Sequence, residues 1–260
     1  MVDASGIWGR FAATWEMTMD PSLPGMLRPR GRRFAPRAYC FPLLGALLGG
    51  VVALCGAIVS AAFNPVAGAF IFALLGTAFW ELKDSGRESA LLFSFLARRF
   101  RGDDSGEALA KMSSSWNIFQ TPPASMLVMA MELLRFSLLF SLSFYGAALW
   151  LWVIVTGVFT VQGYLALCPQ RGGNPPLVVG NIDDRNRMWI AFAVAVLLVL
   201  WNFPMGALVA VLAVVLAARW LAHAADEELG GVTPDFVTLA GGVAGYLLLL
   251  VGILFSLTMN

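Results

Sequence analysis

Seven stretches of the chain are apolar over lengths that approach the thickness of a lipid bilayer. A hydrocarbon core about 30 Å thick needs roughly 17–25 apolar residues in a helix, and its interior leaves no water for unpaired backbone groups. We therefore predict an all-α fold, a polytopic membrane helical bundle with about seven transmembrane helices. The predicted spans are Phe41–Phe63, Val66–Leu82, Met126–Ser143, Gly146–Leu167, Met188–Asn202, Met205–Leu221 and Val237–Met259.

The composition supports a membrane location. Of the 260 residues, 59% are hydrophobic and 13% are charged, whereas a soluble domain is about half apolar and about a quarter charged. The net charge of +1 gives no electrostatic basis for binding nucleic acid. The predicted partners are the lipid bilayer and, in one hypothesis below, other membrane subunits.

The Lys and Arg residues lie on one side of the membrane that the predicted spans would cross. All 17 of them except Arg135 fall before the first span, in the 83–123 loop, between spans four and five, or at the end of span six. The connections on the opposite side, at 64–65, 145 and 203–204, carry no charge. Because cytoplasmic loops are enriched in Lys and Arg, we predict a multi-pass protein of a bacterial-type inner membrane, with a cytoplasmic N-terminus and an external C-terminus.

The predicted organisation is a cytoplasmic N-terminal segment, 1–40, with a basic juxtamembrane stretch, followed by a single transmembrane domain, 41–260. The cytoplasmic loop 83–123 contains an apolar face followed by cations, Glu88–Phe100, which is typical of an amphipathic interfacial helix. The Gly- and Pro-rich segment 168–187 is predicted to be a loop.

Two charged residues fall near the middle of the third predicted span. Glu132 and Arg135 are three residues apart and so share a helix face. Charges in hydrocarbon are costly unless they are paired and face the interior. The pair is either a contact for a substrate or ion, or a self-neutralised anchor of the bundle.

Glycines repeat four residues apart in two of the spans. Gly45 and Gly49 share one face of the first span, and Gly241 and Gly245 share one face of the last. Small residues at this spacing let helices approach closely, which predicts helix packing at both faces.

A cytoplasmic-face polar site is the second candidate. Glu81, Asp84 and Glu88 lie where the second span meets the cytoplasm, and carboxylates at such an edge can hold Mg²⁺ against a diphosphate. Lys83 and Arg87 alternate with them and largely neutralise the site. No metal ligand is predicted here, and a solvated helix end is the alternative interpretation.

Three motifs resemble those of cobalamin-5′-phosphate synthases (adenosylcobinamide-GDP ribazoletransferases). Phe41–Gly49 is similar to the family's F-P-L-x-G-x-x-x-G start, and Gly180–Arg185 is similar to its G-x-x-x-x-R loop. Gly230–Asp235 resembles its G-G-x-T-G-D segment and retains Thr233 and Asp235. The resemblance implies an integral membrane enzyme that joins adenosylcobinamide-GDP to α-ribazole, releases GMP and requires Mg²⁺.

The chain departs from the family at its acidic signature, H-L-D-G-L-A-D-x-x-D-G. The three aspartate positions are occupied by Lys83, Arg87 and Ala90, and the histidine by Glu81. Two glutamates of the late family helix align with Gly242 and Gly245, and the family's D-x-R-x-G-T run aligns with Ser113–Thr121. A cation in place of an aspartate repels a metal ion.

The first hypothesis is therefore a transferase-like scaffold in which Mg²⁺-dependent catalysis is lost or altered. The alternative is a non-catalytic docking subunit of a larger membrane complex. A transporter is less well supported, because transporters carry several polar groups at mid-membrane and broken helices. The catalytic residues are unknown, and whether the chain is an enzyme stays open. The candidate site comprises Glu81, Asp84, Glu88, Thr233 and Asp235, with the intramembrane pair Glu132 and Arg135.

Overall fold

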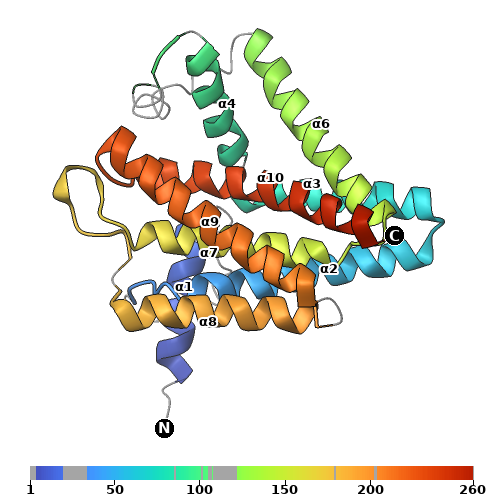
Figure 1. Cartoon of the computed structure of the whole chain (residues 1–260), viewed down its shortest axis with the longest axis horizontal. Helices are drawn as coiled ribbons and strands as arrows, with labels where there is room; N and C mark the ends of the chain where they lie inside the picture. The colour runs from blue at the N-terminus through green and yellow to red at the C-terminus, as the bar shows by residue number, and fades with distance from the viewer. Residues whose placement is uncertain are drawn as a thin grey trace.

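The structure is a computed structural model that describes residues 4–19, 34–84, 86–100, 102–104, 107, 122–178, 180–201 and 204–259. This part of the chain is all-α (Figure 1), with one isolated bridge between Gln170 and Val232. The helices are α1 (Ala4–Thr18), α2 (Cys40–Ala62), α3 (Pro65–Asp84), α4 (Arg87–Phe100), α6 (Pro122–Phe144), α7 (Trp150–Ala166), α8 (Ile182–Val199), α9 (Pro204–Leu229) and α10 (Pro234–Met259).

Helix α7 forms the centre of the bundle. It contacts α2, α8, α9 and α10, and nearly all of its residues are buried. The remaining contacts include the hairpin of α2 and α3 and the pairing of α3 with α6. Helix α7 is largely apolar on all its faces, which is the pattern expected of a helix that other helices surround.

Four helices in the described part of the chain are long and apolar enough to cross a membrane. These candidate spans are Cys40–Ala62, Pro65–Lys83, Met205–Leu229 and Pro234–Leu257. In the first of them only 28% of the apolar window is buried. Its exposed side chains recur at helical spacing along one face, which is the surface that lipid would cover: Leu43, Leu47, Val51, Leu54 and Ile58.

The prediction of seven spans is wrong in number, although every one of the seven apolar segments is helical. Helix α7 has 17 residues and its apolar surface is covered by protein. Helix α8 begins with Asp183 and Asp184 in its first turn, followed by Arg185 and Arg187. Hydropathy along the sequence does not separate burial by protein from burial by lipid.

The predicted loop 168–187 ends earlier than expected. Helix α8 starts at Ile182 because Asn181 caps it, with its side-chain oxygen accepting a hydrogen bond from the Asp184 backbone N–H at 2.9 Å. The predicted amphipathic segment is the helix α4, and Ala90, Leu91 and Phe93 on it are buried.

The two ends of the bundle differ in character (Figure 1). At one end the turns α2–α3, α6–α7 and α8–α9 gather with the C-terminus; Ser60 and Ser143 lie 3.3 Å apart there, and Trp150 stacks on Phe255. At the other end the α7–α8 loop meets the α9–α10 turn, and Arg37 pairs with Asp184 at 2.7 Å. We call this second end the charged end, because Arg37, Arg171 and Asp184 lie there.

The glycines of α2 set its distance from α7. A Cβ at Gly45 would lie 2.9 Å from the Thr156 Cα, and one at Gly49 would lie 3.0 Å from the Trp152 oxygen. Backbone atoms stand in the way in both cases, so the predicted close packing of this face is present. Gly241 and Gly245 also lie at contacts, but they face side chains, Gln162 and Trp80.

This packing gives a direct test. We expect Gly45→Ala to destabilise the protein by about 1–3 kcal/mol, because the added methyl group forces α2 away from α7. Gly50→Ala is the matched control, since its Cβ would meet the Trp152 ring at an ordinary 3.4 Å. Unfolding curves of both variants in the same detergent provide the measurement. Equal stabilities would contradict the proposed close approach.

Candidate functional site: a buried ion cluster at the end of α3

A sharp turn between α3 and α4 brings the acidic residues together. Gly86 has a φ of +75°, a conformation that favours glycine. Its backbone N–H donates to the Glu81 oxygen at 3.1 Å, and a Cβ there would lie 2.8 Å from the Glu81 Oε2. The turn therefore places the start of α4, with Glu88 and Ser89, beside the end of α3.

Arg135 is the centre of the cluster that results. Its side chain is 2% exposed. Its Nη1 lies 3.0 Å from the Glu81 Oε1 and 3.1 Å from the Glu132 Oε2, and its Nη2 lies 3.7 Å from the Glu88 Oε1. One guanidinium thus joins carboxylates from α3, α4 and α6, which suits its planar set of five N–H donors.

Two aromatic rings enclose the same guanidinium. The Arg135 Cζ lies 5.4 Å from the Trp80 ring centroid and 5.1 Å from that of Tyr246. The Tyr246 hydroxyl donates to the Met131 carbonyl oxygen at 3.0 Å and so ties α10 to α6. Cation–π contacts of this kind gain strength when they are shielded from water.

Glu88 is the second centre, and it is almost completely buried. It accepts hydrogen bonds from Lys83 at 2.8 Å and from the Trp80 Nε1 at 2.5 Å. Space for it comes from α10, where a Cβ at Gly242 would lie 2.8 Å from the Glu88 Cγ. Lys83 is 2% exposed and Glu88 1%, so the pairing of the two compensates charges that are both removed from water.

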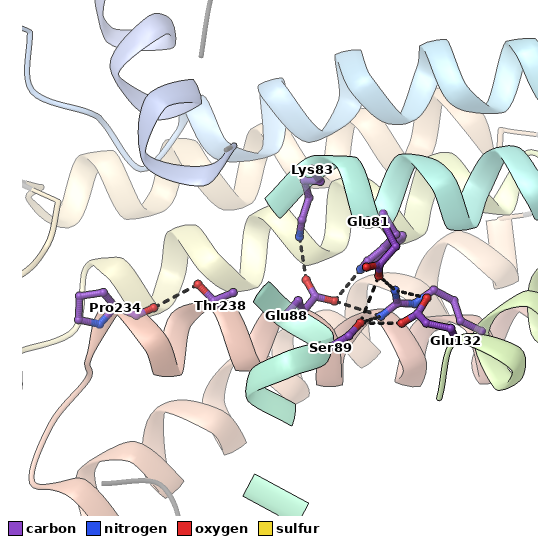
Figure 2. Close-up of polar contacts among 9 residues, drawn as sticks. Glu81, Lys83, Glu88, Ser89, Glu132, Pro234 and Thr238 are labelled. Carbon is purple, nitrogen blue, oxygen red and sulfur yellow. Dashed lines mark hydrogen bonds and ion pairs between the residues drawn. The ribbon is translucent and has the colours of Figure 1, made fainter. Parts of the chain in front are cut away.

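Ser89 links the remaining carboxylates. Its hydroxyl lies 2.6 Å from the Glu132 Oε1 and 3.3 Å from the Glu81 Oε1. Figure 2 shows Lys83 on one side of Glu88, with Glu81, Ser89 and Glu132 on the other. We call Glu81, Lys83, Glu88, Ser89, Glu132 and Arg135 the ion cluster.

The residues of the late motif lie in a separate group. Asp235 forms an ion pair with Arg87, and the Thr233 Oγ1 accepts a hydrogen bond from the Phe236 N–H at 3.2 Å, which caps α10. Glu81 thus pairs with Arg135 in the ion cluster, whereas Asp235 pairs with Arg87 outside it. Asp84 ends α3, but its side chain lies outside the described residues, as does the Ser113–Thr121 segment.

Two further polar groups lie near the charged end. Arg10 donates to the Tyr39 hydroxyl at 3.0 Å, and this hydrogen bond raises the pKa of Arg10. Burial raises the pKa of the Cys168 thiol, which keeps it protonated and unreactive at neutral pH. The three cysteines, Cys40, Cys55 and Cys168, are free of disulfides.

The ion cluster does not fit Mg²⁺. In the part of the chain that the structure describes, no three His, Cys, Asp or Glu residues are arranged to hold a metal ion. The cluster's carboxylates turn toward ammonium and guanidinium groups, whereas Mg²⁺ requires oxygen ligands in near-octahedral geometry. What the arrangement can do is join three helices, α3, α4 and α6, through compensated charges.

Sequence reasoning identified part of this site. It paired Glu132 with Arg135 and expected Lys83 to neutralise the acidic stretch, as the structure shows. It also expected Arg87 to do so, but Arg87 pairs with Asp235 across the charged end. The contributions of Trp80, Ser89 and Tyr246 were missed, since nothing in the sequence marks their approach.

No protein-family model, curated protein or solved structure matches the chain. The described part of the chain is all-α, and its four candidate spans suggest a multi-pass helical membrane protein.

Proposed function

We propose that this chain is a non-catalytic protein of a bacterial-type inner membrane, built on a scaffold that resembles the cobalamin-5′-phosphate synthases. The observation that carries the proposal is the pairing of Glu88 with Lys83 and of Glu81 and Glu132 with Arg135. Carboxylates at the place where the family would gather Mg²⁺ are occupied by the protein's own cations. Their role is then to hold α3, α4 and α6 together.

The test is an assay for the family reaction. We expect purified membranes that contain the protein, incubated with adenosylcobinamide-GDP, α-ribazole and Mg²⁺, to release no more GMP than membranes without it. An active enzyme of the family in the same membranes is the positive control. Turnover that disappears in an Asp235→Ala variant would overturn the proposal, because it would show that the chemistry is retained.

A docking subunit is the form of non-catalytic role that one further observation favours. An apolar groove of about 350 Å³ runs between α9 and α10. Ala213, Ala217 and Ala244 line it, and small residues let a partner's transmembrane helix approach closely. Gentle detergent extraction followed by native mass spectrometry distinguishes a complex from a lone monomer, and a lone monomer would count against docking.

A further inference from the structure

A cavity of about 280 Å³ lies at the charged end, close to the Arg87–Asp235 pair. Its volume is just below the range of about 300–1,000 Å³ that small-molecule sites occupy. Five parts of the chain meet around it: α1, α2, α4, α7 and α10, with Leu177 from the α7–α8 loop. Convergence of so many elements on one space is typical of a binding site.

The inner wall combines one apolar and one polar side chain. Phe41 is fully buried, and Gln162, near the C-terminal end of α7, is 4% exposed. The Gln162 Oε1 has no hydrogen-bond partner among the described residues. A buried amide oxygen without a donor costs free energy, which a donor supplied from the cavity would recover. Gln162 lines the cavity, so a donor bound there would lie beside this amide group.

The outer part of the cavity carries hydrogen-bond donors. The Arg87 side chain is 42% exposed, and a guanidinium has five N–H groups, so its pairing with Asp235 leaves others for a ligand. Thr238 also lines the cavity; its hydroxyl donates to the Pro234 carbonyl oxygen at 3.3 Å and so presents lone pairs (Figure 2). Met17, Met19 and Val237 supply apolar surface.

We propose that this cavity binds a small neutral amphipathic molecule, with an N–H or O–H donor for Gln162, an oxygen acceptor for Arg87 and an apolar body between them. Charge supports the choice of a neutral ligand. Arg87 on the wall opposes a cation, whereas Glu16 on the wall and the pairing of Arg87 with Asp235 oppose an anion. The proposal does not depend on whether the family chemistry is retained.

The experiment uses the full chain in lipid nanodiscs and two probes of one scaffold. Benzamide carries a donor and an acceptor, whereas N,N-dimethylbenzamide keeps the acceptor and lacks the donor. We expect equilibrium dialysis to show that benzamide binds about tenfold more tightly than N,N-dimethylbenzamide. A tenfold difference corresponds to the free energy of roughly one buried hydrogen bond. In the Gln162→Leu variant the preference for benzamide over N,N-dimethylbenzamide should disappear, because benzamide binds more weakly. In Thr160→Val, a matched buried polar change on α7 whose hydroxyl bonds within the helix, the preference should persist.

A cavity-filling variant completes the test. Val237→Trp should abolish binding of both probes. Benzamide binding that survives in Val237→Trp would place the probe elsewhere and overturn the proposal. Failure of benzamide to bind the unmodified protein up to its solubility limit would also overturn it and identify the cavity as a packing void. Each variant is checked first for monodispersity and thermal unfolding, so that misfolding is not scored as lost binding.

Discussion

Replacing Arg135 with methionine is expected to destabilise the protein by about 3–5 kcal/mol, the cost of leaving buried charges without their partner. Glu132 loses the cation at 3.1 Å, and Glu81 the one at 3.0 Å. Methionine keeps most of the volume, so the loss reports the charge, the hydrogen bonds and the cation–π contacts with Trp80 and Tyr246. The measurement is the fraction of protein that remains folded and monodisperse across a denaturant titration.

Two comparisons make this result specific. Arg135→Lys keeps the charge but cannot reach three carboxylates with one planar group, so it should fall between the native protein and Arg135→Met. Arg219→Met removes an exposed arginine on α9 and should change stability by less than about 0.5 kcal/mol. If Arg135→Met were no less stable than Arg219→Met, the ion cluster would have no structural role.

Replacing Glu88 with leucine is expected to be about as damaging. Lys83, which is 2% exposed, loses the carboxylate at 2.8 Å, and the Trp80 N–H loses its acceptor. Removal of one member of a buried ion pair costs about 3–5 kcal/mol, whereas replacement of both members by apolar residues is often neutral. The double variant Lys83→Met/Glu88→Leu should therefore be more stable than Glu88→Leu alone.

A double-mutant cycle measures this coupling, and residues in direct contact couple by about 0.5–3 kcal/mol. The control is Glu227→Leu, which breaks an exposed pair with His223 at 3.2 Å and should have little effect on stability. Additive effects of the Lys83 and Glu88 changes would contradict the proposed coupling of the two charges.

The sequence predicted the helices well because each apolar segment is long and flanked by turn residues. It predicted the spans less well because an apolar segment looks the same whether lipid or protein covers it: α7 is enclosed by other helices, while Leu54 and Ile58 of α2 are exposed. Exposure is a property of the assembled bundle, so it cannot be read from α7 alone.

The candidate site was predictable where its residues are neighbours along a helix. Glu132 and Arg135 are three residues apart, and helical geometry alone brings them together. The approach of Glu81 and Glu88 to Arg135 depends on the positive φ of Gly86 and on the packing of α3 against α6. The space for Glu88 depends on the missing side chain of Gly242. Contacts of these kinds are set by tertiary structure.

The glycines of α10 limit where residues can be inserted into or deleted from the chain. Gly241, Gly242 and Gly245 each leave room for a side chain from a different helix: Gln162 of α7, Glu88 of α4 and Trp80 of α3. Each residue added to a helix turns everything beyond it by about 100°. A single insertion between Pro234 and Gly241 would therefore misalign all three recesses at once, so natural variation in length should be confined to the loops outside this segment.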